Sequence, residues 1–166
     1  NLWVYRELYT QKITADIFAK KVLDLESGEY IRYGVLDAST WARRGDIGPS
    51  IAETMIQAGC RWRPSDRTGR SRISGKLEIH KRLKVEDKEP GIRIFSNCRN
   101  LLRTFPTLPL DDSNPEDINT HVEDHAYDAL RYGCMSRPIH TSYANKAFGN
   151  SNRTANFVPS DKIFGY

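Results

Sequence analysis

The stretch YGVLDAST, residues 33–40, sets the fold class. The apolar run from Ile31 to Leu36 predicts a buried strand, and Asp37 follows directly at its C-terminal end. Outward from this strand, further strands are predicted at 2–9, 60–63 and 92–95, and helices at 14–26, 50–58, 71–84, from Asn97 onward and at 122–135. This alternation predicts an α/β fold with a mixed, largely parallel central sheet flanked by helices.

The 166 residues, of which 39% are hydrophobic, suit a single domain with one core. We expect that domain over residues 1–141 and an extended tail over 142–166, which is rich in Asn, Ser and Gly without periodicity. The three cysteines are far apart and form no CxxC pair, so they predict core thiols of a reducing cytosol rather than a zinc site. No apolar segment has the length of a membrane span and no signal-peptide layout is present, so we expect a soluble intracellular protein without a membrane partner.

Charge is distributed unevenly along the chain, although Lys+Arg 25 against Asp+Glu 21 gives a net charge of only +4. A basic stretch is followed by an acidic one, which suits a nuclease that attracts phosphate and holds cations. The alternative is two solvated charge runs. The basic stretch contains Arg61, Arg63, Arg67, Arg70, Arg72, Lys76, Lys81, Arg82 and Lys84, and the acidic one contains Asp111, Asp112, Glu116, Asp117, Glu123, Asp124 and Asp128.

Asp37 is the first candidate for chemistry, because functional side chains of parallel α/β sheets gather at the C-terminal ends of the strands. A carboxylate at this position is a frequent metal ligand. A turn-forming or helix-capping role is the alternative, and for Asp37 taken alone it is the more common one.

The segment EDHAYDALRYG, residues 123–133, is the second candidate. Helical spacing allows Asp124, His125 and Asp128 to lean over one face, where like charges repel unless something positive answers them. The helix dipole explains why Glu123 and Asp124 are favourable near the helix N-terminus. It does not explain the presence of Asp128, which lies one turn further into the helix. With Asp37, these hard oxygen ligands suit two Mg²⁺ or Mn²⁺ ions that act on a phosphodiester.

Two other features have weaker functional readings. The segment GRSRISGKL, residues 69–77, departs from a phosphate-binding loop in its glycine spacing and in Leu77, so we expect no ATP site in this chain. Trp41 and Trp62 lie beside arginines and could stack on bases, but half-buried packing is the more frequent role of such tryptophans.

The run from Pro90 to Pro138 resembles the C-terminal half of the large terminase subunits of tailed phages and prophages. EDHAYDALRYG is its most specific piece. The segments YRELY and VLDAS occur in the same order as in that family, so the resemblance extends over residues 2–138.

The resemblance implies a ribonuclease H-like fold, related to resolvases and integrases, in which three acidic residues hold two divalent ions. Asp37 matches the second carboxylate and Asp128 the last, with His125 beside the metals and Asp124 as a possible outer-shell helper. Glu7 matches a recurrent family glutamate, for which a structural pairing is the safer interpretation. The first metal-binding aspartate and its strand are expected before Leu2, as is the ATPase domain, so we expect little or no cleavage by this chain alone.

The function implied is a two-metal-ion endonuclease that cuts concatemeric double-stranded DNA during genome packaging. Its partners would be the upstream ATPase domain, the portal protein and the small terminase subunit, in the bacterial cytoplasm at the procapsid portal vertex. The alternatives are a DNA-gripping and portal-docking module without catalysis, and a resolvase or transposase nuclease of the same fold. The predicted DNA-binding residues are Arg61, Arg63, Arg67, Arg70, Arg72 and Lys76.

Overall fold

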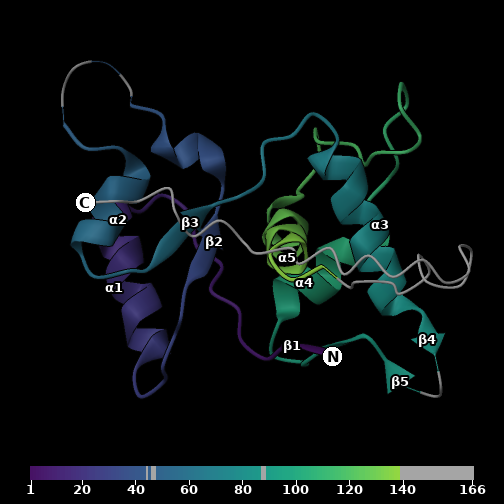
Figure 1. Ribbon diagram of the computed structural model, residues 1–166, viewed down its shortest axis with the longest axis horizontal. Coiled ribbons are helices and arrows are strands. Elements are labelled where there is room, and N and C mark those ends of the chain that lie inside the picture. The colour runs from purple at the N-terminus through teal and green to yellow at the C-terminus, as the bar shows by residue number, and fades with distance from the viewer. Residues whose placement is uncertain (44, 46–47, 87–88, 139–166) are drawn as a thin grey trace, which may run out of the picture.

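Short parallel strand pairs flanked by helices carry the fold in the computed structural model, which describes residues 1–43, 45, 48–86 and 89–138 (Figure 1). The predicted tail, 142–166, and the last residues of the predicted domain lie outside the described residues. The α/β class predicted from the alternating pattern is confirmed.

The strands form separate pairs instead of the single central sheet that was expected. β1 (Leu2–Val4) lies parallel to β6 (Ile92–Ile94), and β2 (Gly34–Leu36) lies parallel to β3 (Trp62–Pro64). β4 (Val85–Glu86) and β5 (Glu89–Pro90) form an antiparallel pair. Within the described residues no strand joins these pairs into one sheet.

The helices occupy the predicted regions, with shifts at their ends. The fourth one begins after Cys98 rather than after Asn97, whose side chain donates to the carbonyl of Tyr5 instead of capping. The last one begins at His125 rather than Val122. The α-helices are α1 (Ala15–Glu26), α2 (Ile51–Gln57), α3 (Ser71–Leu83), α4 (Arg99–Thr104) and α5 (His125–Met135), and the 3-10 turns are η1 (Ala38–Trp41) and η2 (Phe105–Thr107).

Among the described residues, the core consists of two hydrophobic clusters. The smaller one joins α1 and α2 to the β2–β3 pair and is built on Ala19, Met55 and Cys60. Trp62 packs against this cluster and directly beside Gly34, where any side chain would collide with the indole ring. The packing role predicted for Trp62 is therefore confirmed.

The larger cluster joins α3, α4, α5 and β6. It contains Ile79, Ile92, Cys98, Leu101, Ile118, Tyr127, Leu130 and Cys134. In Figure 1, α1 and α2 lie on one side of β2 and β3, and α5 lies on the other side in contact with β2. Helix α5 therefore belongs to the larger cluster and also contacts β2, the strand directly before Asp37.

The buried face of α3 differs from the one predicted. Leu77 and Leu83, expected on the apolar face, are 56% and 44% exposed. Gly75, Glu78 and Arg82 are buried instead, because Gly75 lets α5 approach closely and Glu78 pairs with Arg82 at 3.2 Å. This charged pair can be buried because each side chain compensates the charge of the other.

The segment after β1 is held by side chains rather than by a longer strand. Tyr5 and Arg6 both bond to Glu29 just beyond α1, and Tyr9 donates to Glu123 before α5. The carboxylate of Glu7 accepts from the backbone N–H groups of Asn100 and Leu101, in the first turn of α4. The structural pairing expected for Glu7 is thus observed, and it satisfies free donors at a helix N-terminus.

Cys60, Cys98 and Cys134 are all buried free thiols, as the predicted core role requires. Burial raises the pKa of Cys134 to about 11, so this thiol stays protonated near neutral pH. Among the described residues, no helix is both long enough and apolar enough to cross a membrane.

Candidate active site

Asp37 lies directly after β2 and begins the short helix η1. Its Oδ1 accepts a 2.7 Å hydrogen bond from the backbone N–H of Ser39. The capping role considered for this aspartate is therefore real, but it uses only one carboxylate oxygen. The other oxygen, Oδ2, accepts a 2.7 Å hydrogen bond from the hydroxyl of Tyr132 on α5.

Asp128 is half-buried on α5 and has a positive partner on the same helix. Both Nε and Nη2 of Arg131 lie 2.9 Å from its Oδ1, and the Arg131 side chain is only 5% exposed. The positive charge that the sequence required beside this carboxylate is thus supplied by the protein itself. Asp128 Oδ2 is left facing the hydroxyl of Tyr132 at 3.5 Å.

Tyr132 brings the two predicted carboxylates together. Its hydroxyl donates to Oδ2 of Asp37 at 2.7 Å and also lies 3.5 Å from Oδ2 of Asp128. The two carboxylates therefore lie around a single hydroxyl group and are close to each other. The guanidinium of Arg131 lies 4.5 Å from the centre of the Tyr132 ring, a contact that helps to hold the phenol in place. The proximity of Asp37 and Asp128 therefore depends on Arg131 and Tyr132, which are consecutive residues of α5.

Burial and hydrogen bonding act in opposite directions on these groups. Burial acts to raise the pKa of Asp37, but hydrogen bonds from Ser39 and Tyr132 outweigh it and hold this pKa below its usual value. Burial, followed by the bond to Asp37, raises the pKa of Tyr132. The pair is thus an ionised carboxylate and a neutral phenol over the physiological range.

Asp124 and His125, the other predicted site residues, lie differently. Asp124 is 7% exposed, and burial followed by the charge of Asp128 raises its pKa. His125 is 80% exposed and its Nδ1 lies 3.8 Å from Asp124. The structure therefore places Asp124 in the electrostatic field of Asp128, whereas the contact recorded for His125 is with Asp124 and not with Asp37 or Asp128.

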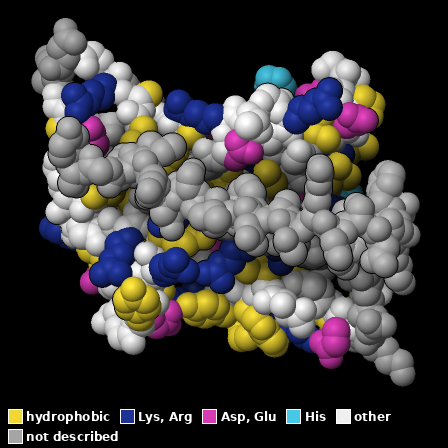
Figure 2. Space-filling model, viewed as in Figure 1, with side chains coloured by type: hydrophobic (Ala, Val, Ile, Leu, Met, Phe, Trp, Pro, Cys, Tyr) yellow, Lys and Arg dark blue, Asp and Glu magenta, His cyan; other side chains and the backbone are white. Residues whose placement is uncertain are grey.

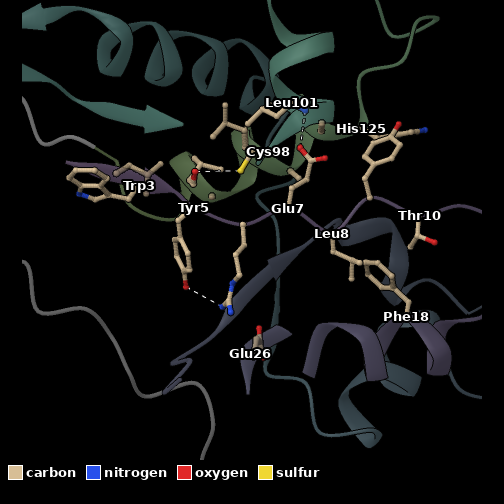
Figure 3. Close-up of a pocket in the computed structure, with 18 of the residues that line it drawn as sticks. Trp3, Tyr5, Glu7, Leu8, Thr10, Phe18, Glu26, Cys98, Leu101 and His125 are labelled. Carbon is tan, nitrogen blue, oxygen red and sulfur yellow. Dashed lines mark hydrogen bonds between the residues drawn. The ribbon is translucent and has the colours of Figure 1, made fainter. Parts of the chain in front are cut away.

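A cavity lies beside β1 and the residues that follow it, not at the carboxylates. It has a volume of about 760 Å³, and its lining includes residues 2–11, Phe18 of α1 and His125 and Ala129 of α5. Figure 3 shows Glu7 pointing toward Leu101 on one side of this segment and Leu8 pointing toward Phe18 on the other. Neither Asp37 nor Asp128 lines this cavity.

The donor set fits a hard divalent cation only in part. Asp37 and Asp128 each present an oxygen toward the same hydroxyl, and Mg²⁺ or Mn²⁺ binds through one or two carboxylates with water and phosphate completing the shell. Among the residues the structure describes, no group of three or more His, Cys, Asp or Glu side chains could hold a metal ion. The described residues therefore bring together two carboxylates, Asp37 and Asp128, and no third such side chain.

The predicted DNA-binding residues fall into two sets. Arg72 pairs with Asp117 at 2.8 Å, and Lys76 donates to the carbonyls of Pro115 and Glu116, so both hold the loop before α5. The other predicted residues, Arg61, Arg63, Arg67 and Arg70, are exposed. Of these, Arg67 donates to the carbonyl of Ala38, next to Asp37.

Sequence reasoning missed Tyr132 and Arg131. Both stand in the EDHAYDALRYG segment, four and three residues after Asp128, and this spacing places them on the same side of a helix. That signal was available for Arg131, since an aspartate and an arginine at this spacing commonly pair. The contact of Tyr132 with Asp37 depends on how α5 crosses β2 and has no local signal.

No protein-family model, curated protein sequence or solved structure matches this chain.

Proposed function

We propose that the chain is the nuclease domain of a phage or prophage large terminase, an endonuclease that hydrolyses double-stranded DNA with two Mg²⁺ or Mn²⁺ ions. One observation carries the proposal. The carboxylates at the end of β2 and on α5, which the resemblance marks as metal ligands, converge on the hydroxyl of Tyr132.

The geometry supports this chemistry through the oxygens it leaves available. Arg131 holds Oδ1 of Asp128, and Ser39 holds Oδ1 of Asp37. The remaining Oδ2 atoms both face the hydroxyl of Tyr132, so a cation that displaced this hydroxyl would meet two oxygens that are already oriented. When bound, the metal ions would activate water and stabilise the leaving oxygen of the phosphodiester.

The charge of the surroundings supports a phosphate-bearing substrate. Arg61, Arg63, Arg67 and Arg70 are exposed, and Arg67 reaches the backbone beside Asp37. In the proposed terminase these side chains would hold duplex DNA near the carboxylates. The portal protein, the small subunit and the ATPase domain enter the proposal through the resemblance alone.

A DNA-gripping and portal-docking module without catalysis is the second candidate. The observation that favours it is the pairing of Asp128 with the buried Arg131, which balances this carboxylate without a metal. In that case DNA binding would depend on the exposed arginines and would be insensitive to Asp37.

The test is cleavage of supercoiled plasmid in Mn²⁺ or Mg²⁺ by the longest polypeptide encoded in the open reading frame of this chain. The terminase proposal predicts cutting that is abolished by chelation, by Asp37→Asn and by Asp128→Asn. Asp112→Asn is the matched control, because Asp112 is an exposed aspartate of the loop before α5. Undiminished cutting by both site variants would refute the proposal, and salt-sensitive binding without cutting would favour the gripping module.

A further inference from the structure

A surface built from arginines and tyrosines lies on the outside of the β2–β3 pair. The Arg61 guanidinium stands 5.6 Å from the centre of the Tyr30 ring, and that of Arg63 stands 4.4 Å from the centre of the Tyr33 ring. Tyr30 is 84% exposed, the highest exposure recorded for any large hydrophobic side chain of the described residues. We call these four residues the arginine–tyrosine face.

The alternation of β3 produces this face. Successive side chains of a strand point to opposite sides, so the burial of Trp62 against the smaller core cluster directs Arg61 and Arg63 outward. The register pairs Gly34 with Trp62 and Val35 with Arg63, which brings Tyr33 beside the outward arginines. The face is therefore a direct consequence of packing the indole ring inward.

The two arginines keep their charge available. Within the described residues, neither Arg61 nor Arg63 lies within ion-pair distance of a carboxylate, whereas Glu29, next to Tyr30, is taken by Arg6 at 2.9 Å. Figure 2 shows Lys and Arg side chains gathered in a band, with hydrophobic side chains beside it, over the part of the molecule where Figure 1 places β2 and β3. The positive charge of Arg61 and Arg63 is therefore available to a polyanion such as nucleic acid.

We infer that the arginine–tyrosine face binds single-stranded nucleic acid. Unpaired bases stack on exposed aromatic rings while arginines track the backbone phosphates, and this combination is typical of proteins that hold single strands. In a duplex the bases are already stacked on one another, so it would engage the arginines and leave Tyr30 and Tyr33 without a role. The exposed ring of Tyr30, together with the half-buried ring of Tyr33, is what favours a single strand.

This inference goes beyond the proposed cleavage site and does not depend on it. Tyr30 and Arg61 lie at the N-terminal end of the parallel β2–β3 pair, whereas Asp37 follows its C-terminal end. Arg63 and Arg67 continue from Arg61 toward that end, and Arg67 reaches the carbonyl of Ala38. A single strand laid along β3 would therefore lead toward the carboxylates.

The experiment is fluorescence anisotropy of a short labelled single-stranded DNA, titrated with the chain in the absence of divalent metal, with unlabelled duplex as competitor. Replacing Tyr30 and Tyr33 by alanine should weaken binding by about five-fold or more for each base that loses its stacking partner. Tyr30→Phe should bind as the parent does, because the ring is kept. Arg61→Ala with Arg63→Ala should make the plot of log K against log salt shallower by about 1.4.

Arg93→Ala is the matched control. Arg93 also lies over an aromatic ring, 4.7 Å from the centre of the Trp3 ring, but Glu89 answers its charge. The inference is overturned if the parent chain does not bind the single strand or prefers the duplex, or if the tyrosine variants bind as the parent does. Circular dichroism of each variant shows whether it is folded, and the high exposure of Tyr30 predicts that the variants of this residue are folded. Loss of cleavage in Asp37→Asn with binding intact would separate this face from the proposed active site.

Discussion

Asp37 and Tyr132, 95 residues apart in the chain, share a 2.7 Å hydrogen bond in which the phenol donates to the carboxylate. This bond joins the strand pair of the smaller core cluster to helix α5 of the larger one. The same hydroxyl lies 3.5 Å from Asp128. The hydrogen bonds of the candidate active site thus also connect the two hydrophobic clusters.

Tyr132→Phe should lower the free energy of unfolding by about 1 to 2 kcal/mol, because it removes a half-buried hydrogen bond to a charged group. Urea denaturation measures this loss. A double-mutant cycle with Asp37→Ala, which removes the acceptor, isolates the contact, and a coupling free energy of about 1 kcal/mol is expected. Strict additivity of the two substitutions would show that the bond contributes nothing to stability.

Gly75→Ala should destabilise the protein by about 1 to 3 kcal/mol, although alanine favours a helix over glycine. A Cβ at Gly75 would stand 2.4 Å from Cγ of the buried Arg131. Gly133→Ala in α5 is the matched control, because its Cβ would meet nothing within 4 Å. That variant should be neutral or more stable by up to about 1 kcal/mol, and equal effects of the two substitutions in thermal or urea unfolding would contradict the packing described.

Glu7→Ala should cost about 1 to 2 kcal/mol of unfolding free energy, because the first turn of α4 loses its acceptor. Glu7→Gln should recover part of the loss, since its amide keeps one acceptor oxygen. Glu116→Ala, an exposed glutamate, serves as control and should leave the free energy of unfolding within about 0.5 kcal/mol of the parent. A loss from Glu116→Ala as large as that from Glu7→Ala would argue against the cap.

The helices could be predicted closely where local chemistry defines their ends. Ser50 and Glu53 form a capping box, and α2 begins directly after Ser50. The face of α3 could not be predicted in this way, because its burial depends on the ion pair of Glu78 with Arg82 and on α5 lying against Gly75. Hydrophobic periodicity assumes that apolar residues face the core, and here the ion pair of Glu78 with Arg82 also faces it.

The site could be predicted only as a set of candidates. The position of Asp37 after a strand and the placement of Asp128 within an apolar helix turn singled out both carboxylates. Their connection through Tyr132 comes from a tertiary contact with no pattern in the local sequence. The basic stretch likewise could not reveal that Arg72 and Lys76 hold the loop before α5, while Arg61 and Arg63 remain exposed.

The loss of folding stability at acid pH should depend in part on the carboxyl group of Glu53. Its hydrogen bond with Arg43, followed by that from the Ser50 N–H, lowers the pKa of Glu53 to about 2. A carboxyl with a lowered pKa in the folded state stabilises the protein above its unfolded pKa of about 4.3, and this contribution is lost as the pH falls toward 2. The advantage of the parent over Glu53→Gln in urea unfolding should therefore be constant from pH 5 to 7 and disappear between about pH 4 and 2. An advantage that persists unchanged at about pH 2 would contradict the assignment.

Binding of Mn²⁺ to the chain, followed by isothermal titration calorimetry, tests most directly whether Asp37 and Asp128 form one metal site. We expect that the parent and Asp112→Asn bind Mn²⁺ alike, and that Asp37→Asn and Asp128→Asn each abolish the binding, because a cation at this site needs the Oδ2 atoms of both carboxylates. Mn²⁺ binding that is unchanged in both site variants would contradict this expectation.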